Sequence, residues 1–362
     1  MPRVWEVPVR DSTRVRDARV AAEEAAAVAG LDERRTAAAA LVATELATNL
    51  LKYAQGGTML LDVVDPPVLP EGTAARSVQI TAIDHGPGMS DVPAALRDGF
   101  STTRSLGAGL GTCRRLSDDF ALHSVPGRGT VAVARLSGSA RPTPGPAPAP
   151  DRNGGGWRPP GVRAGGVNVP FAGAGHSGDA WAWHRDGDRF TLLLADGLGH
   201  GTEAARASSA AVEASRRWGH LPPAEALGRL HEALTGTRGA AVAVAQLDTR
   251  AGLLRFAGIG NVGARLREGD GWRALLSRPG IVGVHRPGRV REDERPWTDD
   301  SLLILHTDGL SSRWSPDPDA GRPATDPAVT AAVTIRDASS PALPVRDDTA
   351  VAVLSPVPPD RS

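Results

Sequence analysis

The chain has 362 residues, and its 41 Lys and Arg residues balance 41 Asp and Glu residues. A net charge of zero disfavours a general role in binding nucleic acid or an acidic membrane surface, because both need an excess of positive charge. The single cysteine, Cys113, excludes an internal disulfide and any zinc site built on two or more cysteines. No run of about 18 apolar residues occurs, and no apolar segment follows the charges at the start, so we expect a cytoplasmic protein with no membrane span.

Composition divides the chain into two parts. Residues 137–161 alternate Pro, Gly and Ala with almost no large apolar residue, which is typical of a linker. We therefore predict one domain at residues 1–136 and a second at residues 162–356, each of ordinary domain size.

The first part mixes helices and strands. Apolar residues spaced for a helix predict helices at 14–28 and 32–54. Short apolar runs predict strands, and a further helical pattern follows a glycine-rich stretch. The predicted strands are 58–64, 77–83 and 130–136, and the third helix is 110–122. The pattern favours an α+β fold class.

Three polar side chains share one face of the second predicted helix. Glu45, Asn49 and Lys52 lie at positions i, i+4 and i+7. On their own they are best interpreted as a solvated helix surface. The next elements change that interpretation.

A glycine-rich loop follows the strand at 77–83. Its sequence, Asp84-His85-Gly86-Pro87-Gly88-Met89, places an acidic residue at a strand end and then two glycines that allow a ligand to approach the backbone. Residues 90–106 are polar and rich in turn residues, as in a mobile lid. The sequence GAGLG at 107–111 then opens a helix, whose free N–H groups suit phosphate.

The ordered series ELATN, DHGPGM and GAGLG resembles the asparagine box and the two glycine boxes of the GHKL ATP-binding fold. Within that group, ELATNLLKYA and LGAGLGTCRRLSDDF are most similar to the RsbT-type anti-sigma serine/threonine kinases. The resemblance covers most of residues 1–136. A P-loop and a dinucleotide-binding fold do not fit, because the Gly-Lys-Ser/Thr ending and a preceding apolar strand are both missing.

The resemblance implies an α/β sandwich that binds Mg·ATP. Asn49 would hold Mg²⁺, Asp84 would accept a hydrogen bond from the adenine amino group, and Glu45 would be the catalytic residue that orients or deprotonates the substrate hydroxyl. Lys52 would neutralise phosphate charge. The other residues implied to bind the nucleotide are Gly86, Gly88, Gly107, Gly109, Leu110 and Gly111. No role is assigned to His85.

Strands predominate after the linker. The apolar runs predict strands at 179–185, 189–196, 239–248, 253–260, 301–308 and 348–354, with helices at 203–218 and 224–234. Asp186-Gly187 between two strands is a hairpin signal and favours an antiparallel sheet.

Aspartates stand at the ends of four of these strands. They are Asp179, Asp196, Asp308 and the pair Asp347-Asp348. The start of one antiparallel strand lies beside the end of its neighbour, so these positions could gather at one sheet edge. Oxygen ligands without His or Cys favour Mg²⁺ or Mn²⁺. Taken singly, Asp196-Gly197 and Asp308-Gly309 remain open between a turn and a metal ligand.

As a series, SGDAW, ADGLGHG, TDGLSSRW and RDDTAV resemble the metal motifs of the SpoIIE-type branch of metal-dependent serine/threonine phosphatases. TRGAAVAVAQLD, FAGIGNVGARL and RPGIVGV are similar to its RsbX-like members. The resemblance implies an αββα sandwich with a site for two Mn²⁺ or Mg²⁺ ions. The implied ligands are Asp179, Asp196, Asp308, Asp347 and the carbonyl oxygen of Gly197. Asp348 is the alternative to Asp347.

Other conspicuous side chains near these motifs receive structural interpretations. His200 and His306 are better explained by packing or capping than by phosphate contact. Trp181 and Trp183 share one strand face and are expected to pack in the core.

Together the resemblances imply a bifunctional regulator. One domain would phosphorylate, and the other dephosphorylate, Ser or Thr of a STAS-type partner in partner-switching control of a stress-response sigma factor. Residues 14–28 could form a homodimer face. An alternative is an ATP-binding module that sequesters a sigma factor or STAS protein without kinase turnover. A third reading is a phosphatase controlled by nucleotide occupancy of the first domain. Glu45 beside Asn49 favours a kinase over a pure sequestering module.

Overall fold

The computed structural model describes residues 3–64, 76–96, 109–138, 161–171, 174–285, 288, 290–311, 314–316, 325–339 and 345–357. Apart from residues 137, 138 and 161, the predicted linker lies outside these described residues, as does Gly107. The described strands form three five-stranded sheets, A, B and C.

Sheet A takes its strands from the first part of the chain. The strand order is β1-β2-β3-β5-β4, and every neighbouring pair is antiparallel. The strands are β1 (Val4–Val9), β2 (Gly57–Val64), β3 (Ser77–Ile83), β4 (Asp119–Val125) and β5 (Gly129–Ser137).

Two long helices cover one face of sheet A. They are α1 (Ser12–Ala29) and α2 (Glu33–Ala54), and each begins at an aspartate whose side chain accepts a backbone N–H of the first turn. Alanines dominate their buried faces, which lets the two helices pack closely against each other and against the sheet. Two short helices complete this part: α3 (Val92–Ala95) and α4 (Leu110–Leu116).

The second part of the chain is an αββα sandwich. Sheet B has the order β13-β10-β9-β8-β7, and sheet C has the order β12-β11-β14-β15-β6. Sheet B contains β7 (Asp179–Asp186), β8 (Arg189–Gly197), β9 (Ala240–Asp248), β10 (Leu253–Ile259) and β13 (Asp293–Pro296). Sheet C contains β6 (Val162–Val169), β11 (Gly263–Glu268), β12 (Gly271–Leu275), β14 (Leu302–His306) and β15 (Thr349–Pro356).

Helices cover the outer faces of this sandwich. Helices α5 (Thr202–Trp218) and α6 (Pro223–Ala233) pack on sheet B, and α7 (Pro327–Ala338) packs on sheet C. The inner faces of the two sheets enclose a core of Leu, Ala and Phe side chains. The predicted α+β class and the predicted αββα sandwich are therefore confirmed.

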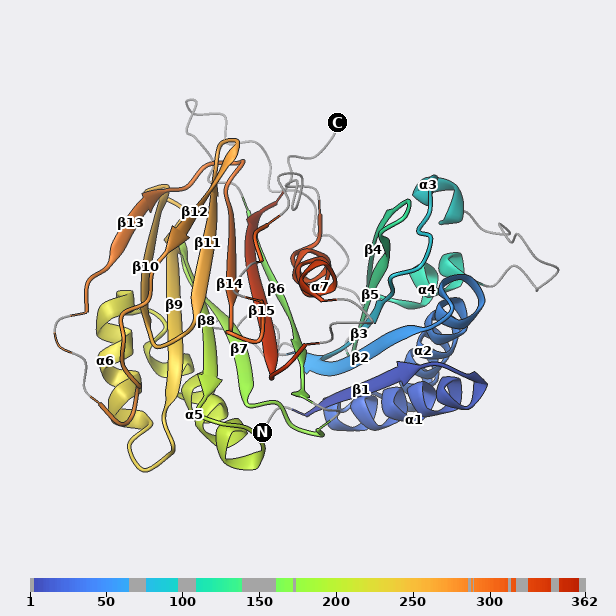
Figure 1. The fold of residues 1–362 in the computed structure, drawn as a ribbon, viewed down its shortest axis with the longest axis horizontal. Helices are drawn as coiled ribbons and strands as arrows, with labels where there is room; N and C mark the ends of the chain where they lie inside the picture. Colours follow the sequence, from blue (N-terminus) through green and yellow to red (C-terminus); the bar gives the residue numbers. More distant parts are fainter. Residues whose placement is uncertain are drawn as a thin grey trace.

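Helix α7 belongs to both halves of the molecule. One side contacts β6 and β15 of sheet C, and the other contacts β3, β4 and β5 of sheet A (Figure 1). Leu60, Ile83, Val131 and Val133 of sheet A join the same apolar cluster as the buried side chains of α7. Both faces of sheet A are thus covered, one by α1 and α2 and the other by α7.

Most predicted elements are confirmed, and one predicted boundary is corrected. The strand predicted at 77–83 is β3 itself, and the helix predicted at 32–54 is α2 with Asp32 as its cap. The helix predicted at 110–122 is wrong beyond Leu116, because the chain turns into β4 to pair with β5. The elements that were not predicted are strands β1, β4, β6, β11, β12 and β13 and helices α3 and α7.

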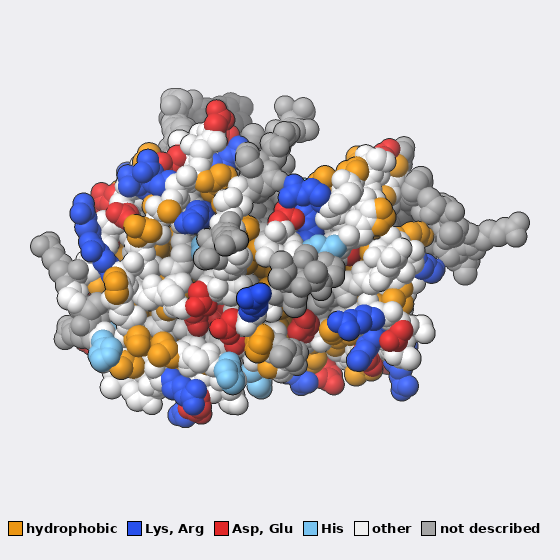
Figure 2. Space-filling view, viewed as in Figure 1, with side chains coloured by type: hydrophobic (Ala, Val, Ile, Leu, Met, Phe, Trp, Pro, Cys, Tyr) orange, Lys and Arg blue, Asp and Glu red, His pale blue; other side chains and the backbone are white. Residues whose placement is uncertain are grey.

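The surface agrees with the zero net charge. On the face shown in Figure 2, acidic and basic side chains of the described residues are interspersed over both halves. Among the described helices, none combines the length and the apolar character that a membrane crossing requires.

Candidate functional site

The first candidate site begins on α2, where it meets α4. Burial raises the pKa of Glu45, and the nearby charge of Lys52 partly offsets that rise. Burial also raises the pKa of the Cys113 thiol of α4 to about 12, with a further contribution from the charge of Glu45. Glu45 therefore lies at the α2–α4 junction, close to both a cation and a buried thiol. Asn49, one turn further along α2, is half-buried, and Lys52 is exposed.

Asp84 lies at the end of β3, on the other side of this site. Its Oδ1 accepts hydrogen bonds from the backbone N–H groups of Gly86, at 2.8 Å, and Thr130, at 3.1 Å. The residue is only 7% exposed. Burial raises the pKa of Asp84, whereas these two N–H groups and the charges of Arg336 and His85 lower it.

The loop that carries the predicted glycines is fixed to the hairpin between β4 and β5. Met89 donates its N–H to Ser124 Oγ at 2.8 Å, and Gly127 donates to the Pro87 carbonyl at 2.8 Å. Gly86 lies against α2, and a Cβ there would meet the Cα of Ala54 at 2.7 Å. The sequence predicted that a ligand would lie close to the backbone of this loop. At Gly86 the close neighbour is instead helix α2 of the protein itself.

The second glycine box lies at the start of α4. Gly109 is the N-cap residue and no side chain caps this helix, while Gly111 is buried. Leu110 packs against the core of the first half. Gly107 and most of the predicted lid lie outside the described residues. The phosphate-binding role of this box stays a prediction.

The second candidate site lies where sheets B and C face each other. Asp179 and Asp196 are directly paired residues of β7 and β8 in sheet B. Asp308 follows β14, and Asp347 precedes β15, both in sheet C. The expectation that these aspartates share one sheet edge is therefore wrong: they come from two facing sheets.

These carboxylates are close enough to disfavour one another's ionisation. Burial raises the pKa of Asp196 to about 7, and the charges of Asp308, Asp347 and Asp348 add to the rise. Burial and then Asp196 raise the pKa of Asp179 well above its usual value. Burial and Asp347 raise the pKa of Asp308, whose side chain accepts a hydrogen bond from Asn261. Such a concentration of like charge fits a cation.

Asp347 and Asp348 differ in what their carboxylates already bind. Asp348 is buried, and its two oxygens accept the N–H groups of Phe171 at 2.7 Å and Gly178 at 2.8 Å. Asp347 is exposed and accepts only the N–H of Asp348 among the bonds described, at 2.9 Å. Of the two, Asp347 has the carboxylate better able to face a metal.

The donor set fits a divalent metal by its chemistry, although it is not converged. Asp179 Oδ2 is buried and has no hydrogen-bond partner among the residues that the structure describes. Within the described ranges, no group of three or more His, Cys, Asp or Glu side chains has the arrangement of a ready-made metal cage. Gly197, the predicted backbone ligand, ends β8 beside Asp196. The individual ligand roles stay predictions.

The two histidines beside the aspartates behave differently. His200 is exposed, whereas His306 contacts Trp314 edge to face at 5.5 Å and has a pKa lowered by burial. His306 therefore packs, as the sequence predicted. Trp181 and Trp183 also pack against the core between the sheets, as predicted.

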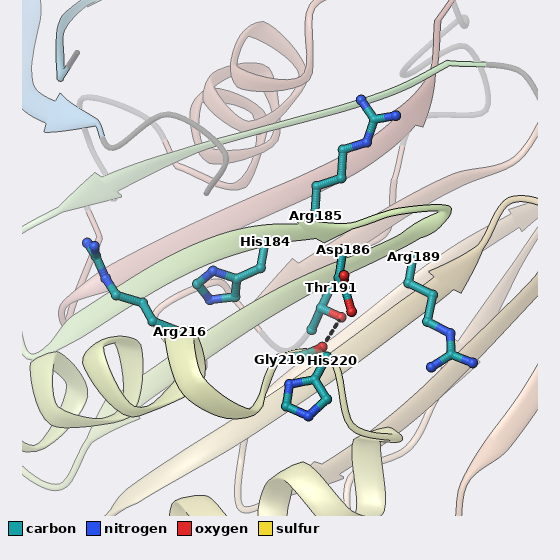
Figure 3. A pocket seen from close by; sticks show the side chains of 8 residues that line it. All are labelled: His184, Arg185, Asp186, Arg189, Thr191, Arg216, Gly219 and His220. Carbon is teal, nitrogen blue, oxygen red and sulfur yellow. Dashed lines mark hydrogen bonds between the residues drawn. The ribbon is translucent and has the colours of Figure 1, made fainter. Parts of the chain in front are cut away.

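A cavity of about 260 Å³ lies at the opposite end of β7 and β8 from Asp179 and Asp196. Its lining includes Arg185, Arg189 and Arg216, whose guanidinium groups point in different directions (Figure 3). We assign it no part in the chemistry, because these cations do not converge on a common point.

Sequence reasoning missed Asn261 and Thr307. Asn261 donates a hydrogen bond to Asp308, and the side chain of Thr307 lowers the pKa of Asp179 against the effect of burial. The only local signal for Asn261 was its place in the Gly-Asn turn between two strands. Thr307 directly precedes Asp308, and its burial was the property that the pattern could not reveal.

Two family models match the chain. Residues 9–135 match the model described as Histidine kinase-like ATPase domain, and residues 186–354 match that described as Stage II sporulation protein E (SpoIIE). Over 91 residues the chain is 40% identical to the serine/threonine-protein kinase RsbT of Bacillus subtilis (strain 168). That alignment takes in 25% of this chain and spans 64% of the length of RsbT. The chain therefore combines a region similar to histidine kinase-like ATPase domains with a region similar to SpoIIE.

Three solved structures are similar to part of the chain. RsbX in complex with magnesium has a TM-score of 0.46 and 20% identity, covering 53% of this chain and 94% of that one. The phosphatase domain of SpoIIE from Bacillus subtilis has a TM-score of 0.42 and 16% identity, with coverages of 57% and 98%. The RsbU and RsbW domains of a Mycobacterium tuberculosis protein give 0.43 and 22%, with coverages of 55% and 62%.

Proposed function

We propose that this protein is a bifunctional regulator. Its N-terminal domain phosphorylates, and its C-terminal domain dephosphorylates, Ser or Thr residues of STAS-type partner proteins. The observation that carries the proposal is the pairing of an RsbT-related ATPase domain with a SpoIIE-type domain in one chain, the second with four aspartates close enough to affect one another's ionisation. We take the domains to be residues 1–136 and 162–356, joined by a linker at 137–161.

In the kinase domain, each proposed role suits the surroundings of the residue. Asn49 would bind the Mg²⁺ that bridges the ATP phosphates, and Lys52 would neutralise phosphate charge. Glu45 has a pKa raised by burial, which makes it a better base toward a serine or threonine hydroxyl. Asp84 would accept a hydrogen bond from the adenine amino group.

In the phosphatase domain, Asp179, Asp196, Asp308 and Asp347 would hold two Mn²⁺ or Mg²⁺ ions, with the Gly197 carbonyl as a further ligand. The ions, when bound, supply Lewis acidity and a water with a lowered pKa for phosphate ester hydrolysis. Thr307 and Asn261 orient Asp179 and Asp308 through their hydrogen bonds.

We propose a cytoplasmic role in partner switching, in which the STAS protein in turn controls a stress-response sigma factor. The resemblance to RsbT, a serine/threonine-protein kinase, supports protein substrates. Helix α1 leaves Val20 and Val28 at 42% and 50% exposure, which supports a homodimer through residues 14–28.

The kinase assignment is tested with labelled ATP, Mg²⁺ and candidate STAS proteins. Wild type should transfer label to a Ser or Thr, and Asn49→Ala should not. Equal labelling by both proteins would refute the assignment. Tight binding of ATP and of a STAS protein or sigma factor, without label transfer, would instead support the sequestering alternative.

The phosphatase assignment is tested separately. Phosphate release from a phosphorylated STAS protein should require Mn²⁺ or Mg²⁺ and should be lost in Asp308→Asn. His200→Ala is the matched control, because His200 is exposed near the same site and carries no proposed role. Full activity in Asp308→Asn would remove the basis for the metal site.

A further inference from the structure

Helix α7 of the SpoIIE-type domain carries a charge where none is expected. The helix is buried from Pro327 to Arg336, and Arg336 is the only arginine among the buried residues of the described chain, with 1% exposure. Burying a cation is costly unless it is paired or hydrogen-bonded. Packing alone could be satisfied by an apolar side chain of similar size. The polar contacts of Arg336 therefore indicate the role of its charge.

Arg336 contacts the start of β5, the strand whose Thr130 is hydrogen-bonded to Asp84. Its Nε donates to Asp337 at 2.8 Å, and its Nη1 approaches the carbonyl oxygen of Gly129 at 3.5 Å, the length of a weak hydrogen bond. Gly129 directly precedes Thr130, whose N–H donates to Asp84 Oδ1 and whose carbonyl accepts the N–H of Asp84. One peptide unit therefore separates the phosphatase-domain arginine from the residue that orients the Asp84 carboxylate.

A second ion pair holds the same part of the interface. Arg128 donates from Nη2 to Asp337 Oδ2 at 2.8 Å. Asp337 thus joins Arg336 of its own helix to Arg128 at the turn between β4 and β5. One polar cluster therefore connects the turn between β4 and β5, the start of β5 and the last turn of α7. Thr130 links this cluster to Asp84.

The electrostatic effect of this cluster reaches the candidate nucleotide site. The charge of Arg336 lowers the pKa of Asp84 against the effect of burial. Burial and the charge of Arg336 both lower the pKa of His85. The charges of Asp84 and Asp337 raise that pKa. An ionised Asp84 is the form that accepts two hydrogen bonds and still offers a lone pair to a ligand.

We propose that Arg336 is a positioning residue of the nucleotide site: although it lies in the SpoIIE-type domain, it fixes the Gly129–Thr130 peptide and keeps Asp84 placed and charged for the amino group of adenine. The proposal rests on the proposed function, since it takes Asp84 as the adenine acceptor. Nucleotide binding in the first domain and the position of α7 in the second are then linked. By thermodynamic reciprocity, ATP must stabilise the Arg336 contacts as much as those contacts favour ATP.

The test compares the binding of ATP with that of purine riboside triphosphate, which lacks only the 6-amino group, to the full-length protein by calorimetry. A hydrogen bond to a charged group accounts for roughly a tenfold preference or more, so wild type should prefer ATP by about that factor. Asp84→Asn should abolish most of the preference. Arg336→Met should reduce it at least about threefold, with the affinity for purine riboside triphosphate unchanged, and Arg336→Lys should restore part of it.

Arg135→Met is the matched control, because Arg135 joins the same two domains at the opposite end of α7. It should leave the preference intact. If Arg336→Met weakens both nucleotides equally, or matches Arg135→Met, Arg336 has only a structural role and the proposal is wrong. If instead wild type shows no preference, or Asp84→Asn keeps it, the proposed nucleotide site fails and the positioning role fails with it.

A wild-type measurement decides the question should Arg336→Met not fold. ATP should slow hydrogen exchange of the amides at residues 335–338 more than purine riboside triphosphate does, at concentrations that saturate the protein equally. Equal protection by the two nucleotides would overturn the proposal.

Discussion

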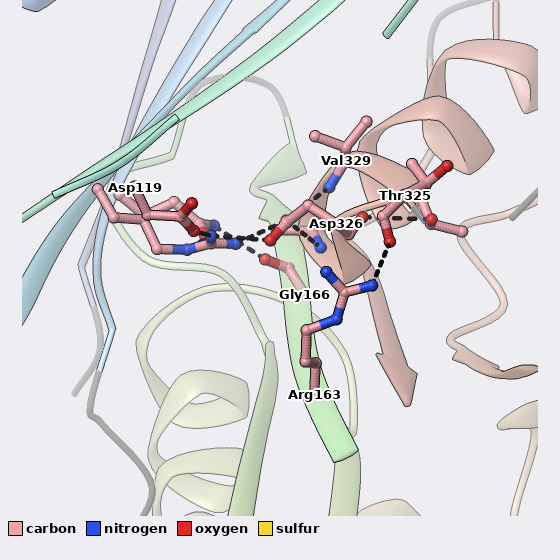
Figure 4. A network of polar contacts seen from close by, with 10 residues as sticks. Asp119, Arg163, Gly166, Thr325, Asp326 and Val329 are labelled. Carbon is pink, nitrogen blue, oxygen red and sulfur yellow. Dashed lines mark hydrogen bonds and ion pairs between the residues drawn. The ribbon is translucent and has the colours of Figure 1, made fainter. Parts of the chain in front are cut away.

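Arg135 of β5 and Asp326, the residue that caps α7, form an ion pair with two hydrogen bonds, Nη2 to Oδ1 at 2.8 Å and Nη1 to Oδ2 at 3.0 Å. They are 191 residues apart in the chain and belong to different halves of the molecule. Arg135 also contacts Asp119 and Gln79, and Gln79 donates to the carbonyl of Gly166 on β6 at 2.9 Å (Figure 4). This polar cluster and the apolar face of α7 join the two halves of the molecule.

Removing the charge of Asp326 should destabilise the protein. Asp326→Asn keeps the hydrogen-bond acceptor that caps α7 but loses the ion pair, so we expect a loss of about 3 kcal/mol in the free energy of unfolding. Asp326→Ala also loses the cap bonds to Ala328 and Val329 and should cost about 1 kcal/mol more. Urea unfolding measures both. Glu23→Gln, which breaks an exposed pair with Arg19, is the control and should change stability by less than about 0.5 kcal/mol.

Asp62 should make stability depend on pH. It faces the same interface from β2, and its Oδ1 is buried without a hydrogen-bond partner in the described part of the chain. Burial raises the pKa of Asp62 to about 7 despite the charge of Arg135. The folded state therefore holds a proton that the unfolded state releases near the ordinary value of 3.8. Stability should fall as pH rises from about 4 to about 7.

The matched variant for this effect is Asp62→Asn, which cannot titrate. Relative to wild type it should gain at least about 1 kcal/mol of unfolding free energy at pH 8 and little at pH 4. Urea unfolding at the two pH values gives the comparison. An equal effect of the substitution at both pH values would show that Asp62 does not hold a proton in the folded state.

Gly129 should tolerate no side chain. Its φ is +84°, and a Cβ there would overlap the backbone carbonyl of Asp84. Gly127, two residues earlier in the same turn, has a φ of +77° but open space around it. Gly127→Ala should therefore cost only the backbone strain, about 1 kcal/mol, whereas Gly129→Ala should cost about 3 kcal/mol or more and weaken ATP binding. Similar losses for both variants, measured by thermal unfolding and calorimetry, would contradict this assignment.

Cys113 should be nearly inert in the folded protein. It is fully buried, and its pKa is raised from 9.0 to about 12 by burial and then by Glu45. At pH 8 the thiolate fraction is lower by roughly a thousandfold than that of an ordinary thiol, and thiol reagents attack only the thiolate. The chain has one cysteine, so the absorbance of the group released by a chromogenic disulfide reagent measures the reaction of Cys113 alone.

Glu45→Gln should speed this labelling severalfold, because it removes a negative charge that raises the pKa of Cys113. Glu33→Gln at the exposed start of α2 should leave the rate unchanged. Fast labelling of the native wild type, without urea, would show that α4 does not bury Cys113 as described.

The elements found from sequence are those with a pronounced apolar run or an apolar pattern of helical period. Alternating or helical apolar patterns sufficed for β3 and α2, since each has one buried face and one different face. Helix α7 was not predicted because sheets A and C cover it on both sides. Its sequence, PAVTAAVTIRDA, therefore has no polar stripe that would indicate an amphipathic helix. Asp326 followed by Pro327 is a typical start of a helix, but no periodic apolar pattern follows it to indicate the helix itself.

In the candidate sites, too, local contacts could be predicted from the sequence and contacts between distant elements could not. Asp179 and Asp196 are partners across adjacent strands, so their proximity follows from a local hairpin. Their approach to Asp308 depends on how sheet B faces sheet C, which no spacing in the chain records. The contact of Arg336 with Gly129 spans 207 residues and depends on domain packing in the same way.

Asp347 and Asp348 are adjacent in sequence, and the structure predicts opposite consequences for replacing them. Asp348→Asn puts an amide where two backbone N–H groups need acceptors, so it should lower the free energy of unfolding in EDTA by about 2 kcal/mol. Asp347→Asn changes an exposed carboxylate and should alter that stability by less than about 0.5 kcal/mol. Mn²⁺ titration followed by electron paramagnetic resonance should show the reverse order, with affinity at least about tenfold lower in Asp347→Asn, because Asp347 contributes to the carboxylate cluster around Asp196. If Asp348→Asn loses Mn²⁺ while Asp347→Asn keeps it, Asp348 is the ligand in place of Asp347.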